Sequence, residues 1–276
     1  MRLLRHWLAA ALGKKPVPTD GYPGMRMKPL KAAALCVISG WMMLLSSPGH
    51  AAPPGIEWLV DCPRLPGQAL DHEVVARTQC GIVTVPQDHQ AADARTLRLT
   101  ITRVGALQPL ERRGVIFARP AAAQANLRGV FAVHLATVWK YDNTEAYRTL
   151  TRFYDVIELS PRNSRNALAS EQAAWDMEFV RQQLGEQRIN FVGIAQGNLL
   201  GAGYAQLFAD RVERMVLIEP AGSAAQAFAT QPATLRLKGP YLQSPTTDAS
   251  QCVSRWVGTY LAHGRQPPAS SSCLVD

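Results

Sequence analysis

Residues 190–208 read NFVGIAQGNLLGAGYAQLF, and the architecture of the whole chain can be worked out from this stretch. Its first part is apolar and predicts a buried β-strand, and its second part has the spacing of an amphipathic α-helix. Between them lies Gly193-Ile194-Ala195-Gln196-Gly197, a short turn with glycine on both sides. The sequence therefore predicts a strand, a tight turn and a helix in direct succession.

The two glycines have the spacing of G-x-S-x-G, the turn that carries the nucleophilic serine of many hydrolases, but alanine stands at the serine position. The central residue of such a turn is strained, with positive φ, and small residues on either side let strand and helix approach closely. Gly193 and Gly197 meet this need, whereas the methyl group of Ala195 can neither give a proton nor attack. We expect a vestigial nucleophile turn made of Gly193, Ala195, Gln196 and Gly197, without a complete catalytic site.

Further apolar runs predict the remaining strands, and amphipathic segments between them predict helices. This alternation favours an α/β architecture: a mostly parallel sheet with right-handed crossovers and flanking helices. Because the pattern fades after Pro220, we expect the sheet to be incomplete at the C-terminal end. Strands are predicted over residues 80–86, 97–104, 114–118, 153–160, 189–195 and 214–220, and helices over residues 170–184 and 196–209.

Composition divides the chain into three parts. Residues 1–51 are predicted to be an N-terminal extension and signal peptide, because a basic stretch at 27–31 precedes an apolar run at 32–45 and a small-residue cleavage site after Ala51. Residues 52–222 form the predicted α/β core, and residues 223–276 a partial cap-like tail. We expect an exported protein, periplasmic or secreted, that meets the membrane only through the signal segment; an uncleaved anchor is the alternative.

Four cysteines remain after the predicted cleavage site, and an even number in an exported chain indicates disulfides. They are Cys62, Cys80, Cys252 and Cys273. Three pairings are open. Pairing between sequence neighbours would close two loops of roughly 20 residues, each stabilising the fold by roughly 3 kcal/mol.

The charge and motif content excludes several classes of function. Seven Lys or Arg residues and one Asp in residues 1–51 account for most of the net charge of +8, so the core presents no basic stripe for nucleic acid. No Cys or His spacing matches a metal site, and no motif indicates a cofactor. The sequence does not determine the oligomeric state.

Several blocks together resemble the secreted tripeptidyl-aminopeptidase-like (TAP-like) α/β-hydrolases. The resemblance implies an exported serine exopeptidase, with an acid and a histidine on later strands and an oxyanion hole on the loop after an early strand. The most specific block is residues 184–217. The blocks are WLVDCP (58–63), CGIVTVPQDH (80–89), LRLTITRV (97–104), GVIFARP (114–120), YDVIELSPR (154–162) and LGEQRINFVGIAQGNLLGAGYAQLFADRVERMVL (184–217).

The differences from this family lie at the positions that its catalytic chemistry requires. Alanine replaces the nucleophile at Ala195, and the family's glycine-rich oxyanion loop becomes Arg119-Pro120-Ala121-Ala122. Glycines in that loop let N–H groups turn toward an oxyanion, and alanines obstruct such conformations. The family's Asp-Pro-Arg-Gly turn becomes Ser160-Pro161-Arg162-Asn163, and the given sequence ends before the strands that would carry the acid and the histidine.

Several other side chains are of types that can act as catalytic groups. Ser160 and Ser164 are interpreted as turn serines, Glu219 as a solvated carboxylate at a strand end, and Arg119 as a surface cation. His134 is expected to be a partly buried helix residue, and Trp139, Tyr141 and Tyr147 to pack on a helix face. His263 is the one histidine that follows the turn, and it lies in the tail.

The sequence thus predicts an α/β-hydrolase-fold pseudoenzyme that binds a peptide or protein partner through the former cleft. Two alternatives stay open. One is an active serine-type hydrolase or aminopeptidase with a non-standard site, and the other is a truncated product without function.

Overall fold

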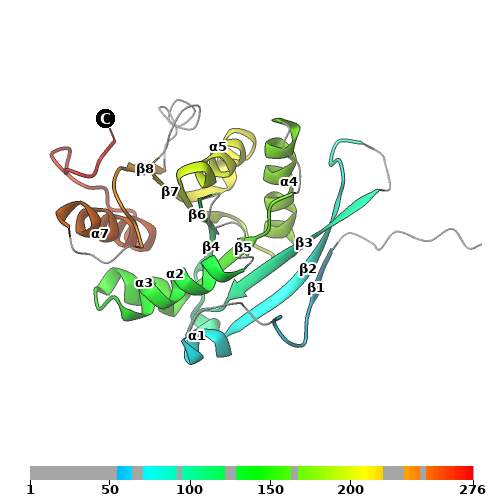
Figure 1. Ribbon diagram of the computed structural model, residues 1–276, viewed down its shortest axis with the longest axis horizontal. Coiled ribbons are helices and arrows are strands. Elements are labelled where there is room, and N and C mark those ends of the chain that lie inside the picture. The colour runs from blue at the N-terminus through cyan, green and yellow to red at the C-terminus, as the bar shows by residue number, and fades with distance from the viewer. Residues whose placement is uncertain are drawn as a thin grey trace, which may run out of the picture. The chain divides into compact units, whose positions relative to one another are not determined.

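The computed structural model describes residues 55–63, 71–91, 95–121, 129–162, 167–219, 233–242 and 247–275. The predicted signal segment lies outside these residues. The strands are β1 (Gly55–Trp58), β2 (Thr78–Pro86), β3 (Thr96–Val104), β4 (Gly114–Arg119), β5 (Tyr154–Leu159), β6 (Ile189–Ile194), β7 (Val212–Ile218) and β8 (Thr234–Leu237). The helices are α1 (His72–Ala76), α2 (Val130–Tyr141), α3 (Glu145–Phe153), α4 (Ala167–Gln183), α5 (Asn198–Leu207) and α7 (Asp248–His263) (Figure 1).

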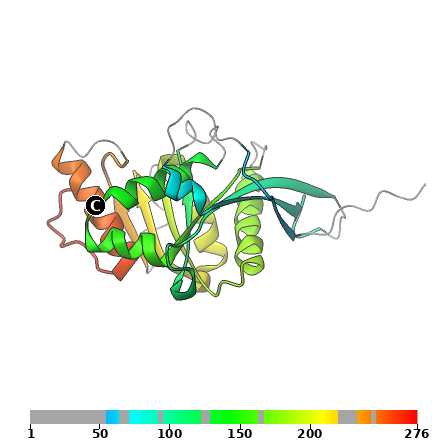
Figure 2. The same cartoon turned by 90° about the horizontal axis from the view of Figure 1, so that it is seen from below.

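The strands form one eight-stranded sheet in the order β1-β2-β3-β5-β4-β6-β7-β8. β1, β2, β3 and β5 pair antiparallel in turn, and every pairing from β5 through to β8 is parallel. The predicted mostly parallel sheet with flanking helices is confirmed. The long β2–β3 hairpin extends away from the helices in both views (Figures 1 and 2).

Helices cover both faces of the sheet. Along β4, Val115 and Phe117 join one apolar cluster and Ile116 and Ala118 the other, as the alternation of a doubly buried strand requires. The first cluster includes residues of α4 and α5, and the second includes residues of α2, α3 and α7. The carboxyl ends of the parallel strands therefore lie between two helical layers, where ligand sites of open α/β sheets occur.

Two strands come from segments with no predicted strand. The proline-rich stretch at the start of the predicted core contains β1, which pairs with β2 along its whole length. β8 lies in the predicted tail, and it extends the sheet by pairing in parallel with β7. The described part of the tail thus belongs to the same compact unit as the core, which spans Gly49–Asp276.

α7 is also part of the tail, and local signals explain its ends. Thr247 and Ser250 form a capping box at its start, and Gly264 ends it with a left-handed φ of 70°. Its buried face, which includes Val253, Val257 and Leu261, joins the core cluster. This apolar face fixes α7 against the sheet.

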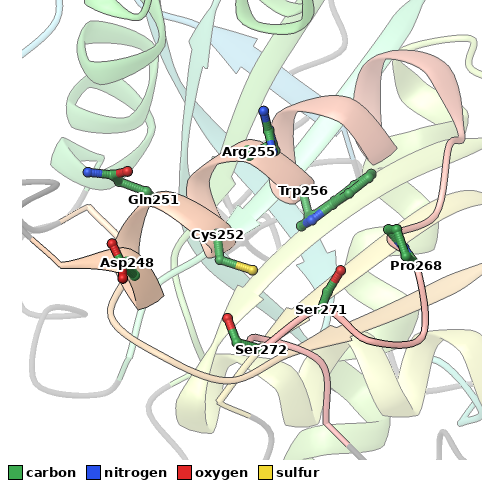
Figure 3. Close-up of a pocket in the computed structure, with 8 residues that line it drawn as sticks. All are labelled: Asp248, Gln251, Cys252, Arg255, Trp256, Pro268, Ser271 and Ser272. Carbon is green, nitrogen blue, oxygen red and sulfur yellow. The ribbon is translucent and has the colours of Figure 1, made fainter.

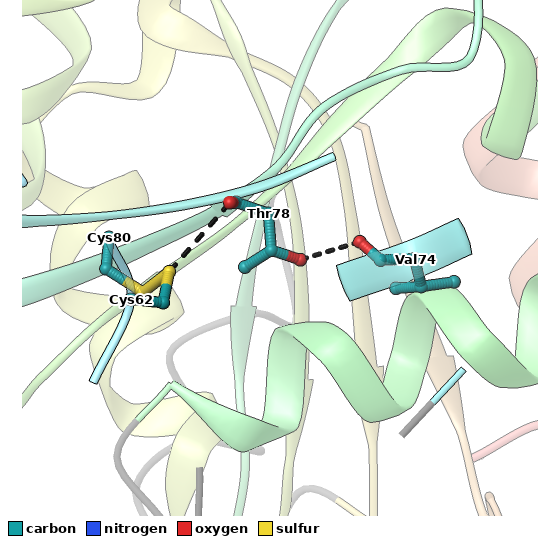
Figure 4. The surroundings of a disulfide bond; sticks show 4 residues. All are labelled: Cys62, Val74, Thr78 and Cys80. Atoms are coloured by element: carbon teal, nitrogen blue, oxygen red, sulfur yellow. Dashed lines mark hydrogen bonds between the residues drawn. A yellow bond between two sulfur atoms is a disulfide. The ribbon is translucent and has the colours of Figure 1, made fainter. Parts of the chain in front are cut away.

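Both disulfides join sequence neighbours: Cys62–Cys80 and Cys252–Cys273. The first ties the end of β1 to β2, and Figure 4 shows Thr78 beside it. The Thr78 hydroxyl donates a 2.7 Å hydrogen bond to the carbonyl of Val74 in α1. Of the three pairings that the sequence allowed, the structure contains the local one.

Candidate functional site

The predicted turn connects β6 to α5 directly. Ile194 ends the strand in an extended conformation, and Ala195 turns the chain with a left-handed φ of 47°. Such a φ strains any residue with a Cβ atom, and it is the conformation that a nucleophile turn demands of its central residue. Ala195 is half-buried and the neighbouring Gln196 is exposed, so the turn is accessible to solvent.

The flanking glycines are required by close packing. A Cβ added at Gly193 would lie 2.7 Å from the Oδ1 atom of Asn198. A Cβ added at Gly197 would lie 2.5 Å from the carbonyl oxygen of Arg119 and 2.8 Å from that of Pro120. The chain has therefore kept the geometry of the turn, whereas the group that would react there is absent.

The loop after β4 faces this turn. The carbonyl oxygens of Arg119 and Pro120 lie against Gly197. An oxyanion hole needs donors aimed at the developing negative charge, and these two carbonyl oxygens are acceptors. Ala121 is half-buried, and Ala122 lies outside the described residues.

Arg119 is not the surface cation that was expected. Its Nη1 atom donates a 3.0 Å hydrogen bond to the carbonyl of Leu159, which ends the neighbouring strand β5. Burial lowers the pKa of the Arg119 guanidinium, and the carboxyl of Glu158 opposes that shift. Because β4 lies beside β6, with Arg119 paired to Gly193, this cation stands next to the turn.

Glu158 is a buried carboxyl group that the sequence did not single out. It is 5% exposed, and it accepts a 3.0 Å hydrogen bond from the backbone N–H of Ala132 in the first turn of α2. Burial raises the pKa of Glu158. Hydrogen bonds from backbone N–H groups at the start of α2 and the nearby charge of Arg119 act in the opposite direction and lower the pKa. The α2 N-terminus is thus held by a side chain from β5.

Glu219 lies on the other side of the turn. The pairing of Ile194 with Ile218 makes Ala195 and Glu219 the next residues on neighbouring strands, and Glu219 also has a left-handed φ, of 52°. Its N–H donates a 2.8 Å hydrogen bond to the carbonyl of Leu237 in β8, and its side chain is exposed. Two strained residues with side chains therefore lie side by side at the carboxyl ends of the neighbouring strands β6 and β7.

The structure describes three of the other candidates, Ser160, His134 and His263. The Ser160 hydroxyl accepts a 2.8 Å hydrogen bond from the N–H of Thr100, which fixes it to β3. Ser164 lies outside the described residues. His134 is half-buried in α2, where burial lowers its pKa, and His263 is exposed at the end of α7.

Sequence comparison adds the family. Residues 145–266 match the family model described as alpha/beta hydrolase fold. The chain has the alpha/beta hydrolase fold. The resemblance inferred from the sequence blocks is confirmed at the level of this fold and of distant similarity to tripeptidyl aminopeptidases.

The curated relatives are tripeptidyl aminopeptidases of Streptomyces lividans and Streptomyces coelicolor. Each is 27% identical over 215 residues, which is 61% of this chain and 38% of the relative. The chain therefore spans less than half the length of these relatives. Among solved structures, Cfl2 from Burkholderia cenocepacia gives a TM-score of 0.36 at 11% identity, covering 61% of this chain and 46% of that one. A hydrolase from Pseudomonas aeruginosa also gives 0.36, at 19% identity, covering 52% and 49%.

A histidine–aspartate pair lies in the described part of this alpha/beta hydrolase fold, and it belongs to a structural cluster. His89 Nε2 lies 2.7 Å from Asp176 Oδ1 in α4, and Arg162 donates two 2.6 Å hydrogen bonds to the same carboxylate. Arg162 also donates to the carbonyls of Pro86 and Gln87. The cluster connects the segment after β5 to the β2–β3 hairpin, and the Arg162 side chain within it is 5% exposed.

In the described part of the chain, no group of three or more His, Cys, Asp or Glu side chains is arranged to hold a metal ion. None of the helices described is long and apolar enough to cross a membrane. The two disulfides are consistent with an oxidising, extracytoplasmic location.

Proposed function

We propose that this protein is an exported pseudoenzyme that binds a peptide or protein partner in the cleft of a former serine hydrolase. One observation carries the proposal: Ala195 occupies a nucleophile turn whose strained φ and tight glycine packing persist. Without a hydroxyl at this position, no covalent acyl intermediate forms by the usual route.

The retained strain supports a binding role. A left-handed residue with a Cβ costs about 1–2 kcal/mol, and such residues persist where the surrounding structure holds them, often at functional sites. Here two of them, Ala195 and Glu219, lie side by side. We would expect a turn that no longer forms part of a binding site to lose this strained left-handed conformation more readily than one that still does.

The charges around Ala195 suit a peptide. Arg119 ends β4 on one side of β6, and Glu219 follows β7 on the other side. A peptide carries an amine and a carboxylate, or charged side chains, that complement such a pair, and the exposed amide of Gln196 both donates and accepts hydrogen bonds. The curated relatives carry the name tripeptidyl aminopeptidase, which supports a peptide as the ligand class.

Export is part of the proposal. Disulfides persist mainly in oxidising compartments. Both predicted disulfides are formed, and the basic and apolar segments of residues 27–45 have the composition of a signal peptide. Measuring the N-terminus of the protein after expression in a bacterial host with an intact export pathway tests cleavage after Ala51; a full-length cytoplasmic product would overturn export.

The binding role is tested with variants of the central residue. Asn tolerates a left-handed φ, so Ala195→Asn adds bulk to the cleft without new backbone strain, and Ala195→Gly keeps it open. The probe is a set of fluorescein-labelled tri- to hexapeptides with free N-termini, followed by fluorescence anisotropy. We expect binding to the wild type and to Ala195→Gly, and at least a tenfold weaker affinity for Ala195→Asn.

Activity is measured on the same preparations. We expect no labelling by a fluorophosphonate reagent above a heat-denatured control, and no release of chromophore from aminoacyl or ester substrates. Labelling or turnover by the wild type would overturn the pseudoenzyme and favour a non-standard hydrolase. Equal peptide affinity of all three proteins would remove the cleft as the binding site.

A further inference from the structure

A pocket of about 480 Å³ lies along α7, apart from the elements that surround Ala195. One wall is a stripe of α7, and the other is the segment that returns after the helix (Figure 3). The helix residues have the spacing i, i+3, i+4, i+7 and i+8, so all five lie on one helix face. The lining residues are Asp248, Gln251, Cys252, Arg255, Trp256, Pro268, Ser271 and Ser272.

Two opposite charges stand at different points of the helix stripe. Asp248 and Arg255 are both exposed, and Arg255 follows Asp248 by seven positions in α7. At a rise of 1.5 Å per residue, this separation is about 10 Å along the helix axis. Three residues of extended peptide also span about 10 Å.

The middle of the pocket offers an apolar surface and hydroxyl groups. Figure 3 shows the indole of Trp256 extending toward the ring of Pro268. Ser271 and Ser272 stand on the opposite wall, where their hydroxyls can donate to or accept from a peptide backbone. An aromatic or aliphatic side chain can therefore stack against Trp256 while the backbone meets the serines.

The two walls are held at a fixed spacing. The Cys252–Cys273 disulfide crosses from α7 to the returning segment next to Ser272. The same segment is hydrogen-bonded to the end of β8, because Lys238 N–H donates to the carbonyl of Cys273 at 2.8 Å. A pocket with fixed walls spends little ordering entropy when a ligand binds.

We propose that this groove is a second binding site, which takes a short peptide of about three residues with free ends. Its amine lies toward Asp248, its carboxylate toward Arg255 and its central apolar side chain against Trp256. The site is independent of the cleft at Ala195 and does not rest on the function proposed for that cleft.

The experiment uses Ala-Phe-Ala in three forms: unmodified, N-acetylated and C-amidated. Affinities are measured by titration calorimetry on the Ala195→Asn protein, which separates this site from the cleft. We expect each blocking group to weaken binding about two- to fivefold, as the loss of a solvent-accessible charge pair does. In Arg255→Gln the amidated and free peptides should bind alike, and in Asp248→Asn the acetylated and free peptides should bind alike.

Matched variants outside the groove control for net charge. Arg265→Gln and Asp210→Asn change exposed residues and should leave all three affinities unchanged. Two results would overturn the proposal. One is that no peptide form gives heat although the protein still unfolds cooperatively, and the other is that the blocking groups weaken binding equally in the groove variants and in the Ala195→Asn protein without them. Binding of maltotriose that is insensitive to both charge variants would assign the groove to a saccharide instead.

Discussion

Trp139 and Tyr241, 102 residues apart in the chain, are joined by a hydrogen bond of 2.9 Å from the indole Nε1 to the phenol oxygen. Both side chains are buried, and the phenol oxygen of Tyr147 lies 3.4 Å from that of Tyr241. Tyr147 in turn donates a 2.7 Å hydrogen bond to the carbonyl of Ser254 in α7. These hydrogen bonds connect α2 and α3 to the segment after β8 and to α7, so they hold the C-terminal part of the protein on the core.

The first prediction concerns Tyr241→Phe. The substitution keeps the ring but leaves the buried N–H of Trp139 without its acceptor, so the free energy of unfolding should fall by about 1–3 kcal/mol. Burial raises the pKa of Tyr241 to about 12, so the effect should be constant between pH 6 and 9. Tyr141→Phe is the control: Tyr141 was expected to pack on a helix face but is 66% exposed, and its hydroxyl donates to Asp71. Urea unfolding at 25 °C should show a smaller loss for Tyr141→Phe, and equal losses would contradict the prediction.

The second prediction concerns Gly197→Ala. The new Cβ would lie 2.5 Å from the Arg119 carbonyl oxygen, and because that atom belongs to the backbone, β4 or the turn must move. We expect a loss of about 1–3 kcal/mol in the free energy of unfolding. At Gly55 an added Cβ meets nothing within 4 Å, so Gly55→Ala should change stability by less than about 0.5 kcal/mol. Chemical denaturation of both variants checks the difference, and a neutral Gly197→Ala would mean that the turn is not tightly packed.

The third prediction concerns the strain at Ala195. Glycine adopts a left-handed φ without a Cβ clash, which relieves about 1–2 kcal/mol, although it adds about 0.4–1 kcal/mol of unfolded-state entropy. Ala195→Gly should therefore raise the free energy of unfolding by up to about 1.5 kcal/mol. Ala202→Gly, in the regular part of α5, should lower it by about 1 kcal/mol. Thermal melts that shift in the same direction for both variants would argue against strain at Ala195.

The central strands could be predicted because their signal is local. The apolar runs at 114–118, 153–160, 189–195 and 214–220 lie in β4, β5, β6 and β7. Strands that are buried on both faces need apolar side chains at successive positions, and this pattern is visible without any knowledge of partners. The bounds differ by two residues or fewer, as expected where strands fray into turns.

The edge strands could not be predicted because their conformation depends on distant partners. β1 is GIEW beside a proline-rich stretch, and β8 is TLRL after a segment rich in Ala, Gln and Thr. Four residues carry too little periodicity to identify a strand. Pairing with β2 and with β7 supplies the conformation instead.

At the site, the sequence located the turn but not its electrostatics. The spacing of Gly193, Ala195 and Gly197 is a local signal, and the structure places these residues between β6 and α5. Arg119 interacts with Glu158 and with the carbonyl of Leu159, which belong to another strand, and no local pattern in the sequence indicates these contacts. A charged residue directly after a doubly buried strand is the one signal that could have drawn attention to Arg119.

The last prediction follows from the buried carboxyl of Glu158, whose pKa is raised above the ordinary value of 4.5. The folded state therefore holds a proton that the unfolded state releases, so the stability from this group falls as the pH rises from about 4.5 through the folded-state pKa. Glu158→Gln cannot titrate, and its amide oxygen can still accept from the Ala132 N–H. Relative to the wild type, this variant should become progressively more stable between pH 4.5 and 7.5, as measured by urea unfolding at half-unit steps. Two parallel stability curves over that range would show that the Glu158 carboxyl is not held protonated by burial. A variant that becomes less stable relative to the wild type as the pH rises would show that the attraction between the Glu158 carboxylate and Arg119 outweighs the desolvation of Glu158.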